Sequence, residues 1–154
     1  MTSVESRLAS LGLQLPSVAK PIASYIPGTR TGNLVFTSGQ LNFRDGKLTA
    51  TGKVGKDLTI EQGQEAAKVA ALNCLAIVKD QVGDLDKVVK VVRLVGHVAA
   101  GPGFTDISKV VNGASDMVVH VLGDKGKHTR LALGAAELPM GAPVEVEMIV
   151  EVKA

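Results

Sequence analysis

The chain has 154 residues, of which 45% are hydrophobic and 21% are charged, with a formal net charge of +2. Such a chain can bury the core of one domain, and its composition excludes intrinsic disorder, which goes with low hydrophobicity and high net charge. Because the basic residues are scattered and only 3% of the residues are aromatic, we expect no nucleic-acid partner.

The same inventory limits metal, disulfide and membrane chemistry. The single cysteine, Cys74, excludes an internal disulfide and a multi-cysteine metal site. The three histidines are dispersed along the sequence, so we expect no bound metal. No apolar run is long enough to span a bilayer, and the first residues do not resemble a signal peptide, which together favour a cytoplasmic protein without a membrane partner.

The N-terminal part of the chain predicts a short helix followed by a hairpin. The spacing of Thr2 and Glu5 matches a capping box, so a helix is expected from Thr2 to Leu11. Residues 23–26 and 34–38 are rich in apolar and β-branched side chains and predict two strands. The segment between them contains Pro, Gly and Asn and is expected to form the turn.

The middle of the chain predicts two long helices and a central strand. A further turn and short strand are expected near Leu48. The clearest helix begins at a second capping box, residues 59–62, and runs to Gly83 with apolar residues at helical spacing. The Val-rich run 88–99 predicts a strand covered on both faces. A second long helix is expected from about residue 108 to residue 122.

Two strands close the chain, at residues 129–135 and 144–152, and we expect them to pair around a Pro/Gly turn. The order of elements predicts an α+β domain, with a mostly antiparallel sheet and the two main helices on one face. The other face is of mixed polarity, so we expect an oligomer to cover it. We interpret residues 1–154 as one domain in which residues 1–20 form an N-terminal extension.

Arg130 is the strongest candidate for chemistry. It stands among Thr, Leu, Ala and Gly in a predicted strand, where a guanidinium is costly to desolvate unless an anion pairs with it. Its planar guanidinium can donate two parallel hydrogen bonds to a carboxylate. If both closing strands alternate, Arg130 and Glu145 lie on the side turned away from the core. The pair is then either an anion-binding site or a structural ion pair between neighbouring strands.

Other residues give weaker signals. Ser38 and Gly39 follow a predicted strand, where a glycine lets a ligand approach the backbone. Tyr25 is the only tyrosine, and Asn112 is expected on the outer side of a helix; each alone is interpreted as structural. Cys74 lies on the apolar side of a predicted helix, which favours a buried packing thiol over a nucleophile.

Three segments carry a family resemblance, namely residues 25–40, residues 111–112 and residues 130–147. They resemble the Rid family, the reactive-intermediate (enamine/imine) deaminases, whose members are also described as YjgF-like or endoribonuclease L-PSP proteins. The resemblance implies a chorismate-mutase-like α+β fold that assembles as a homotrimer, with sites in the clefts between subunits. The N-terminal extension suggests a longer subgroup.

The resemblance also implies a reaction. Small 2-imino or enamino acids would be hydrolysed to 2-oxo acids and ammonia without a cofactor. Arg130 would hold the substrate carboxylate, and Glu145 would orient or activate the attacking water. The residues that would line the pocket are Tyr25, Ser38, Gly39, Asn112 and Ala132.

Ala132 is a departure from the family pattern, because well-studied members have a cysteine at this place. Catalysis therefore depends on whether the thiol or only the backbone contacts the ligand. His128 shares the predicted face of Arg130 and either tunes the site or is a plain strand residue. Two alternatives stay open: a non-catalytic trimer that binds 2-oxo acids through the same arginine, and the endoribonuclease or translation inhibitor of the older family label.

Overall fold

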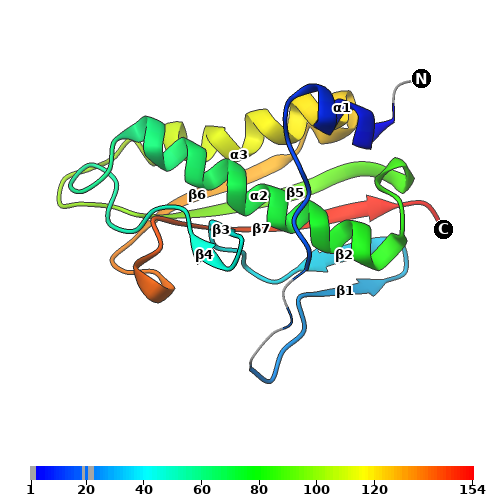
Figure 1. Ribbon diagram of the computed structural model, residues 1–154, viewed down its shortest axis with the longest axis horizontal. Coiled ribbons are helices and arrows are strands. Elements are labelled where there is room, and N and C mark those ends of the chain that lie inside the picture. The colour runs from blue at the N-terminus through cyan, green and yellow to red at the C-terminus, as the bar shows by residue number, and fades with distance from the viewer. Residues whose placement is uncertain (1–2, 19, 21–22) are drawn as a thin grey trace.

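A five-stranded sheet organises the computed structural model, which describes residues 3–18, 20 and 23–154 (Figure 1). The strands lie in the order β1-β2-β7-β5-β6. All neighbours are antiparallel except β5 and β6, which are parallel. The bounds are β1 (Gly28–Thr31), β2 (Leu34–Thr37), β5 (Val88–Ala99), β6 (Thr129–Ala135) and β7 (Val144–Val152), with a separate hairpin of β3 (Phe43–Arg44) and β4 (Lys47–Leu48).

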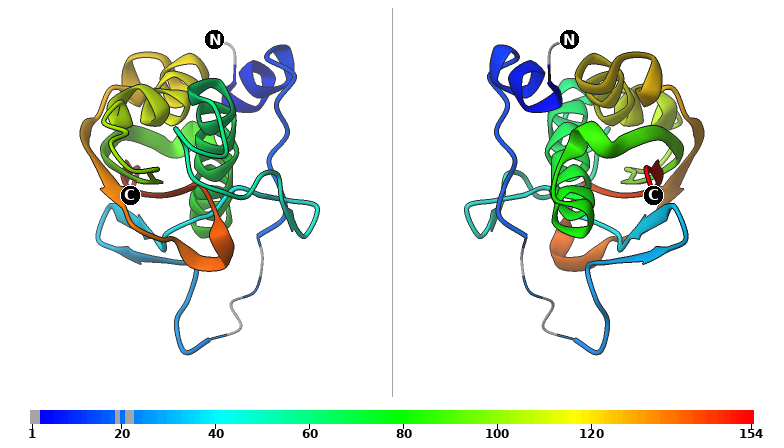
Figure 2. Two further views of the ribbon diagram at one scale, coloured as in Figure 1. Left: turned by 90° about the vertical axis from the view of Figure 1, so that its left-hand side faces the viewer. Right: turned by 90° about the vertical axis from the view of Figure 1, so that its right-hand side faces the viewer.

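The two long helices, α2 (Ile60–Val82) and α3 (Ile107–Leu122), cover one face of the sheet, as the side views in Figure 2 show. α2 begins at the predicted capping box. Thr59 Oγ1 accepts a hydrogen bond from the Gln62 N–H at 3.1 Å, and Gln62 Oε1 accepts one from the Thr59 N–H at 2.9 Å. The predicted α+β class, with a mostly antiparallel sheet and both helices on one face, is confirmed.

The core lies between this helical layer and the sheet. Alternate residues of β7, from Val144 to Val152, are almost completely buried and face α2. The predicted apolar side of α2 is buried against them. The apolar residues at every second position of β7 and those at helical spacing in α2 therefore pack against each other in one layer.

Glycines allow α2 and α3 to pack closely. A Cβ built on Gly113 of α3 would overlap the backbone of Gln64 in α2, and one on Gly63 would lie 2.9 Å from Val110 Cγ1. Neither position can take a larger residue unless the helices move apart. This contact matters for function because it fixes the position of α3, whose side chains reach β6.

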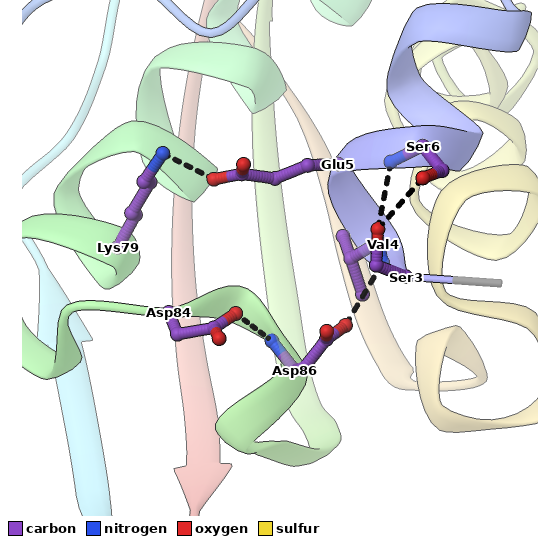
Figure 3. Close-up of polar contacts among 7 residues, drawn as sticks. All are labelled: Ser3, Val4, Glu5, Ser6, Lys79, Asp84 and Asp86. Carbon is purple, nitrogen blue, oxygen red and sulfur yellow. Dashed lines mark hydrogen bonds and ion pairs between the residues drawn. The ribbon is translucent and has the colours of Figure 1, made fainter. Parts of the chain in front are cut away.

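The short N-terminal helix is present as α1 (Val4–Ser10), but its cap differs from the prediction. Thr2 lies outside the described residues. Ser3 is the N-cap, and its hydroxyl accepts a hydrogen bond from the Ser6 N–H at 3.1 Å (Figure 3). Two further segments are 3-10 turns that join the larger elements, η1 (Leu85–Lys87) and η2 (Gly123–Gly126), and a third, η3 (Pro139–Gly141), precedes β7.

α1 is attached to the rest of the chain by polar and apolar contacts. The Val4 N–H donates to Asp86 Oδ1 at 2.9 Å, and Glu5 forms an ion pair with Lys79 of α2 (Figure 3). Val4 and Leu8 are buried as part of the core. Because the ion pair is partly exposed, it contributes less than the buried side chains.

The predicted first strand is wrong. Residues 23–26 form a bend and coil, and the strand β1 begins only at Gly28, so residues 27–28 do not belong to the hairpin turn. Pairing runs from Gly28 with Thr37 to Thr31 with Leu34, which leaves Gly32-Asn33 as a two-residue turn. The β-branched and aromatic content of residues 23–26 favours a strand, but no strand among the described residues pairs with them.

The predicted pairing of the two closing strands is also wrong, because β5 lies between β6 and β7. The chain passes from β5 through α3 to β6, and a helical crossover of this kind returns the next strand parallel to the first. β6 thus takes one side of β5, and β7 pairs antiparallel on the other side.

We predict that Gly113→Ala lowers the free energy of unfolding by about 1–2 kcal/mol. The added Cβ would overlap the Gln64 carbonyl oxygen, a backbone atom. The overpacking cost is therefore expected near the upper end of its usual range of about 1–3 kcal/mol, whereas alanine gains only roughly 1 kcal/mol over glycine in a helix. Urea denaturation measures the change. Ser108→Ala, an exposed change in the same helix, is the control and is expected to stay within about 0.5 kcal/mol of the wild type. Equal or greater stability of Gly113→Ala would contradict this packing.

Candidate functional site

Arg130 lies on the helix-covered face of β6. It is paired in register with the buried Leu94 of β5, and its half-buried side chain points to α3. Its Nη1 donates to Asn112 Oδ1 at 2.7 Å and to Ser115 Oγ at 3.3 Å. The guanidinium is therefore held by neutral acceptors of α3. Neither acceptor balances its positive charge, so an anion can still pair with it.

The rest of β6 shows why Arg130 takes this face. Alternate residues from Arg130 to Gly134 lie beside Leu94, Gly96 and Val98, which belong to the helix-covered side of β5. Ala132 packs against the core, and a Cβ on Gly134 would lie 3.5 Å from the Ile107 side chain. The expectation that Arg130 faces away from the core is wrong.

Glu145 lies on the opposite, open face of the sheet. It alternates with the buried Val144 and Val146 in β7, and it is paired in register with His97 of β5. Its half-buried carboxylate packs against Gly39, where a built Cβ would lie only 2.5 Å from Glu145 Oε1. Any side chain at position 39 would displace the carboxylate, so the glycine signal read from the sequence has a steric cause.

An irregularity at the end of β2 brings Gly39 over Glu145. Phe36 is paired with Ile149, whereas the next pairing joins Gln40 to Val146, so β2 has one more residue than β7 in this interval. Such a bulge bends a strand and redirects its residues. The sequence gives no signal for it beyond the glycine itself.

Ser38 connects this region to the segment that carries Tyr25. The Ser38 hydroxyl donates to the Ile26 carbonyl at 2.6 Å, and the Ser38 N–H donates to the Pro27 carbonyl at 2.7 Å. Tyr25 and Ile26 are 58% and 62% exposed, on a loop that extends away from the sheet (Figures 1 and 2). Two large apolar side chains are therefore more than half exposed in this subunit.

The predicted site residues thus form two clusters. The arginine cluster comprises Asn112, Arg130 and Ala132 on the helix-covered side of β6 and α3. The glutamate cluster comprises Tyr25, Ser38, Gly39 and Glu145 on the other side of the molecule. Because Arg130 and Glu145 lie on opposite faces of one sheet with β5 between their strands, the structural ion pair considered for them is not formed.

Sequence reasoning missed Ser115, which contacts Arg130 directly. A signal was present, because Asn112 and Ser115 are three residues apart and therefore share a helix face. Asn112 was expected on the outer side of α3, and this is wrong, since its side chain accepts from Arg130. His128 lies behind Ser115, with Nε2 at 2.9 Å from the hydroxyl oxygen.

Comparison with known proteins identifies the family. A family model described as "YjgF/chorismate mutase-like, putative endoribonuclease" matches residues 5–152. The chain belongs to this YjgF family. The resemblance noted in the sequence is therefore confirmed at the level of the family, and so is the YjgF-like fold.

Individual relatives of this YjgF-family chain agree over nearly its whole length. Protein TCP17 from Trypanosoma cruzi is 42% identical over 149 residues, which are 96% of this chain and 93% of TCP17. The crystal structure of Atu1372 from Agrobacterium tumefaciens, a protein of unknown function, is 44% identical, with a TM-score of 0.92 over 97% of this chain and 92% of Atu1372. A "putative endoribonuclease" from Shewanella oneidensis MR-1 is 32% identical, with a TM-score of 0.94 over 97% and 99% of the two chains.

Other features of this YjgF-family chain do not coincide with the two clusters. Cavities of about 580 and 460 Å³ lie between residues 11–18 and α2, and none of the predicted site residues lines them. Among the described residues, no group of three or more His, Cys, Asp or Glu side chains could hold a metal ion. Within the same part of the chain, every helix is too short or too polar to cross a membrane.

Cys74 is a packing thiol, as predicted. It is completely buried in α2, and its Sγ lies 3.2 Å from the Val146 carbonyl oxygen and 3.7 Å from Thr37 Oγ1. Burial raises the pKa of Cys74 from 9.0 to about 12, so the group stays a neutral thiol at physiological pH. A neutral buried thiol is a poor nucleophile.

We predict that Cys74 reacts very slowly with a thiol reagent such as DTNB in the folded protein. With its pKa raised to about 12, its thiolate fraction at pH 8 is about a thousandfold lower than in the unfolded chain. Absorbance at 412 nm, followed with and without 6 M guanidinium chloride, measures the two rates. Raising the pH above 9 should accelerate labelling of the folded protein. Equal rates at pH 8 in both states would contradict the burial of Cys74.

Proposed function

We propose that this chain is a deaminase that hydrolyses small 2-imino or enamino acids to 2-oxo acids and ammonia without a cofactor. We further propose that it acts as a homotrimer whose sites combine the arginine cluster of one subunit with the glutamate cluster of another. The observation that carries the proposal is the placement of Arg130 and Glu145 on opposite faces of the sheet. Residence in the cytoplasm remains a prediction.

The free edge of Arg130 supports a carboxylate substrate. Both hydrogens of Nη1 are directed to Asn112 and Ser115. Within the described part of the chain, Nε and Nη2 make no hydrogen bond, so the edge they form is available. That edge has two parallel N–H groups, the geometry that binds a carboxylate in a bidentate manner.

Glu145 supports the hydrolytic step. In the proposed reaction, a water oxygen attacks C2 of the protonated imine, and Glu145 takes a proton from that water. Glu145 then passes that proton to the nitrogen, and it takes the remaining hydroxyl proton as the C2–N bond breaks and ammonia leaves. The ammonia or solvent removes the proton from Glu145, and the water oxygen becomes the new carbonyl oxygen, so the reaction balances without an oxidant.

The size of the substrate requires the two clusters to come close together. In a 2-imino acid the carboxylate is bonded directly to C2, so a water that attacks C2 must lie within a few ångströms of the carboxylate held by Arg130. Glu145 of the same subunit is on the other face of the sheet and cannot reach this position. A second subunit can supply it.

The exposed surface supports such an assembly. The edge strand β6 carries Leu131 and Leu133, which are 38% and 45% exposed on the open face, and the loop with Tyr25 and Ile26 extends from the opposite side of the sheet. A ring built by a three-fold axis uses two different surfaces of each subunit and repeats the same contact at every interface. Apolar groups at both edges of the sheet suit that arrangement.

The other activities considered from the sequence have less support. A binding protein without turnover would use the same Arg130 edge, and it is distinguished only by the absence of product. An endoribonuclease, the activity in the family description, is disfavoured by the near-neutral charge of +2 and by the low aromatic content of 3%.

We predict that Arg130→Ala lowers kcat/KM at least about a hundredfold, since two charge-assisted hydrogen bonds to the substrate are lost. Ammonia or 2-oxobutyrate release is measured in an assay coupled to threonine dehydratase, which generates the imine. Arg44→Ala, which removes an exposed arginine outside both clusters, should leave the rate unchanged. Analytical ultracentrifugation checks that each variant keeps the assembly of the wild type. Full acceleration by Arg130→Ala would refute the proposed role.

A further inference from the structure

Arg130 is the end of a continuous network of hydrogen bonds. Its Nη1 donates to Asn112 Oδ1 at 2.7 Å and to Ser115 Oγ at 3.3 Å. Ser115 Oγ lies 2.9 Å from His128 Nε2, and His128 Nδ1 lies 2.6 Å from the Gly126 carbonyl oxygen. The network thus links Arg130 of β6 to α3 and to the end of η2.

The chemistry of these groups sets the direction of each hydrogen bond when the His128 ring is neutral. The Gly126 carbonyl can only accept, so Nδ1 of His128 carries a hydrogen. In the neutral imidazole Nε2 then has no hydrogen and accepts from the Ser115 hydroxyl. The Ser115 hydroxyl thus donates its hydrogen to His128, and a lone pair of its oxygen accepts the hydrogen bond from Arg130 Nη1.

The network is anchored on a tightly packed part of the fold. Gly126 is buried, and a Cβ built there would lie 2.5 Å from the Val118 carbonyl oxygen of α3. The carbonyl that accepts from His128 therefore belongs to a turn packed directly on the helix that carries Ser115. Both ends of the network are held by α3, so its members have little freedom to separate.

We propose that Ser115 and His128 are positioning residues that orient the Arg130 guanidinium before a ligand binds. The guanidinium is planar, so fixing both hydrogens of Nη1 fixes the direction of the Nε–Nη2 edge as well. Ordering this edge in advance removes part of the entropy that a flexible arginine would lose on binding. The ligand class, a small carboxylate, rests on the proposed function; the orientation of Arg130 does not.

A purely structural role is the competing explanation, because the same hydrogen bonds also tie α3 to β6. Conservative variants separate the two roles. Ser115→Thr keeps a hydroxyl at the same place, whereas Ser115→Ala removes it. His128→Gln keeps an acceptor for the Ser115 hydroxyl, whereas His128→Ala does not. Ser108→Ala and His120→Ala remove the same groups from exposed positions of α3 and serve as matched controls.

Isothermal titration calorimetry with 2-oxobutyrate provides the first readout. Ser115→Ala loses a hydrogen bond to the guanidinium, and His128→Ala loses the acceptor that orients the Ser115 hydroxyl. Each should raise the Kd about three- to tenfold. Ser115→Thr and His128→Gln should stay within about twofold of the wild type, as should both controls. An unchanged Kd in Ser115→Ala, or an equal loss in Ser115→Ala and Ser115→Thr, would overturn the proposal.

NMR of the ligand-free protein provides a readout that does not need the proposed function. The Arg130 guanidinium hydrogens, assigned with Arg130→Lys, should exchange slowly with water in the wild type and in Ser115→Thr, and rapidly in Ser115→Ala. Identical exchange in the wild type and Ser115→Ala would overturn the positioning role. If the wild type binds no 2-oxobutyrate, the proposed substrate class fails, and this NMR comparison alone decides the role of Ser115.

Discussion

The pleat of a single sheet separates the two charges on which the proposed chemistry depends. Side chains of a strand alternate between faces, and the register places Arg130 beside the buried Leu94 and Glu145 beside His97. No rotation of either side chain brings them to the same face. One chain therefore offers a cation on one side and a carboxylate on the other, whereas the proposed 2-imino acid substrate needs both at once.

Other features of the fold serve this separation. The crossover through α3 makes β6 an edge strand and lays Asn112 and Ser115 against Arg130, so that neutral acceptors hold the guanidinium without cancelling its charge. On the other face, the bulge after β2 leaves Gly39 against the Glu145 carboxylate. Each charge is thus held by its own part of the chain, and neither arrangement requires the other.

The sequence predicted the elements better than their arrangement. Capping residues and periodicity located α2, β5 and β7, because these signals act within one segment. Strand order depends on how a crossover returns, and this placed β5 between the two closing strands. Arg130 was placed on the wrong face for a different reason: the more apolar set of β6, with Leu131 and Leu133, lies partly exposed on the open face. Because Arg130 was expected away from the helices, its contact with Ser115 was not predicted. Residues 23–26 have strand propensity, but no strand in the described part of the chain pairs with them, so they do not form one.

Mixing two inactive variants tests the shared site most directly. Arg130→Ala keeps the glutamate cluster and Glu145→Gln keeps the arginine cluster, so the two chains are refolded together in equal amounts and assayed for deamination. In random trimers, about a quarter of the sites combine two intact clusters, and we expect about a quarter of the wild-type activity from the mixture and almost none from either variant alone. A mixture as inactive as its components, with mixed trimers verified by native mass spectrometry, would contradict a site built from two subunits.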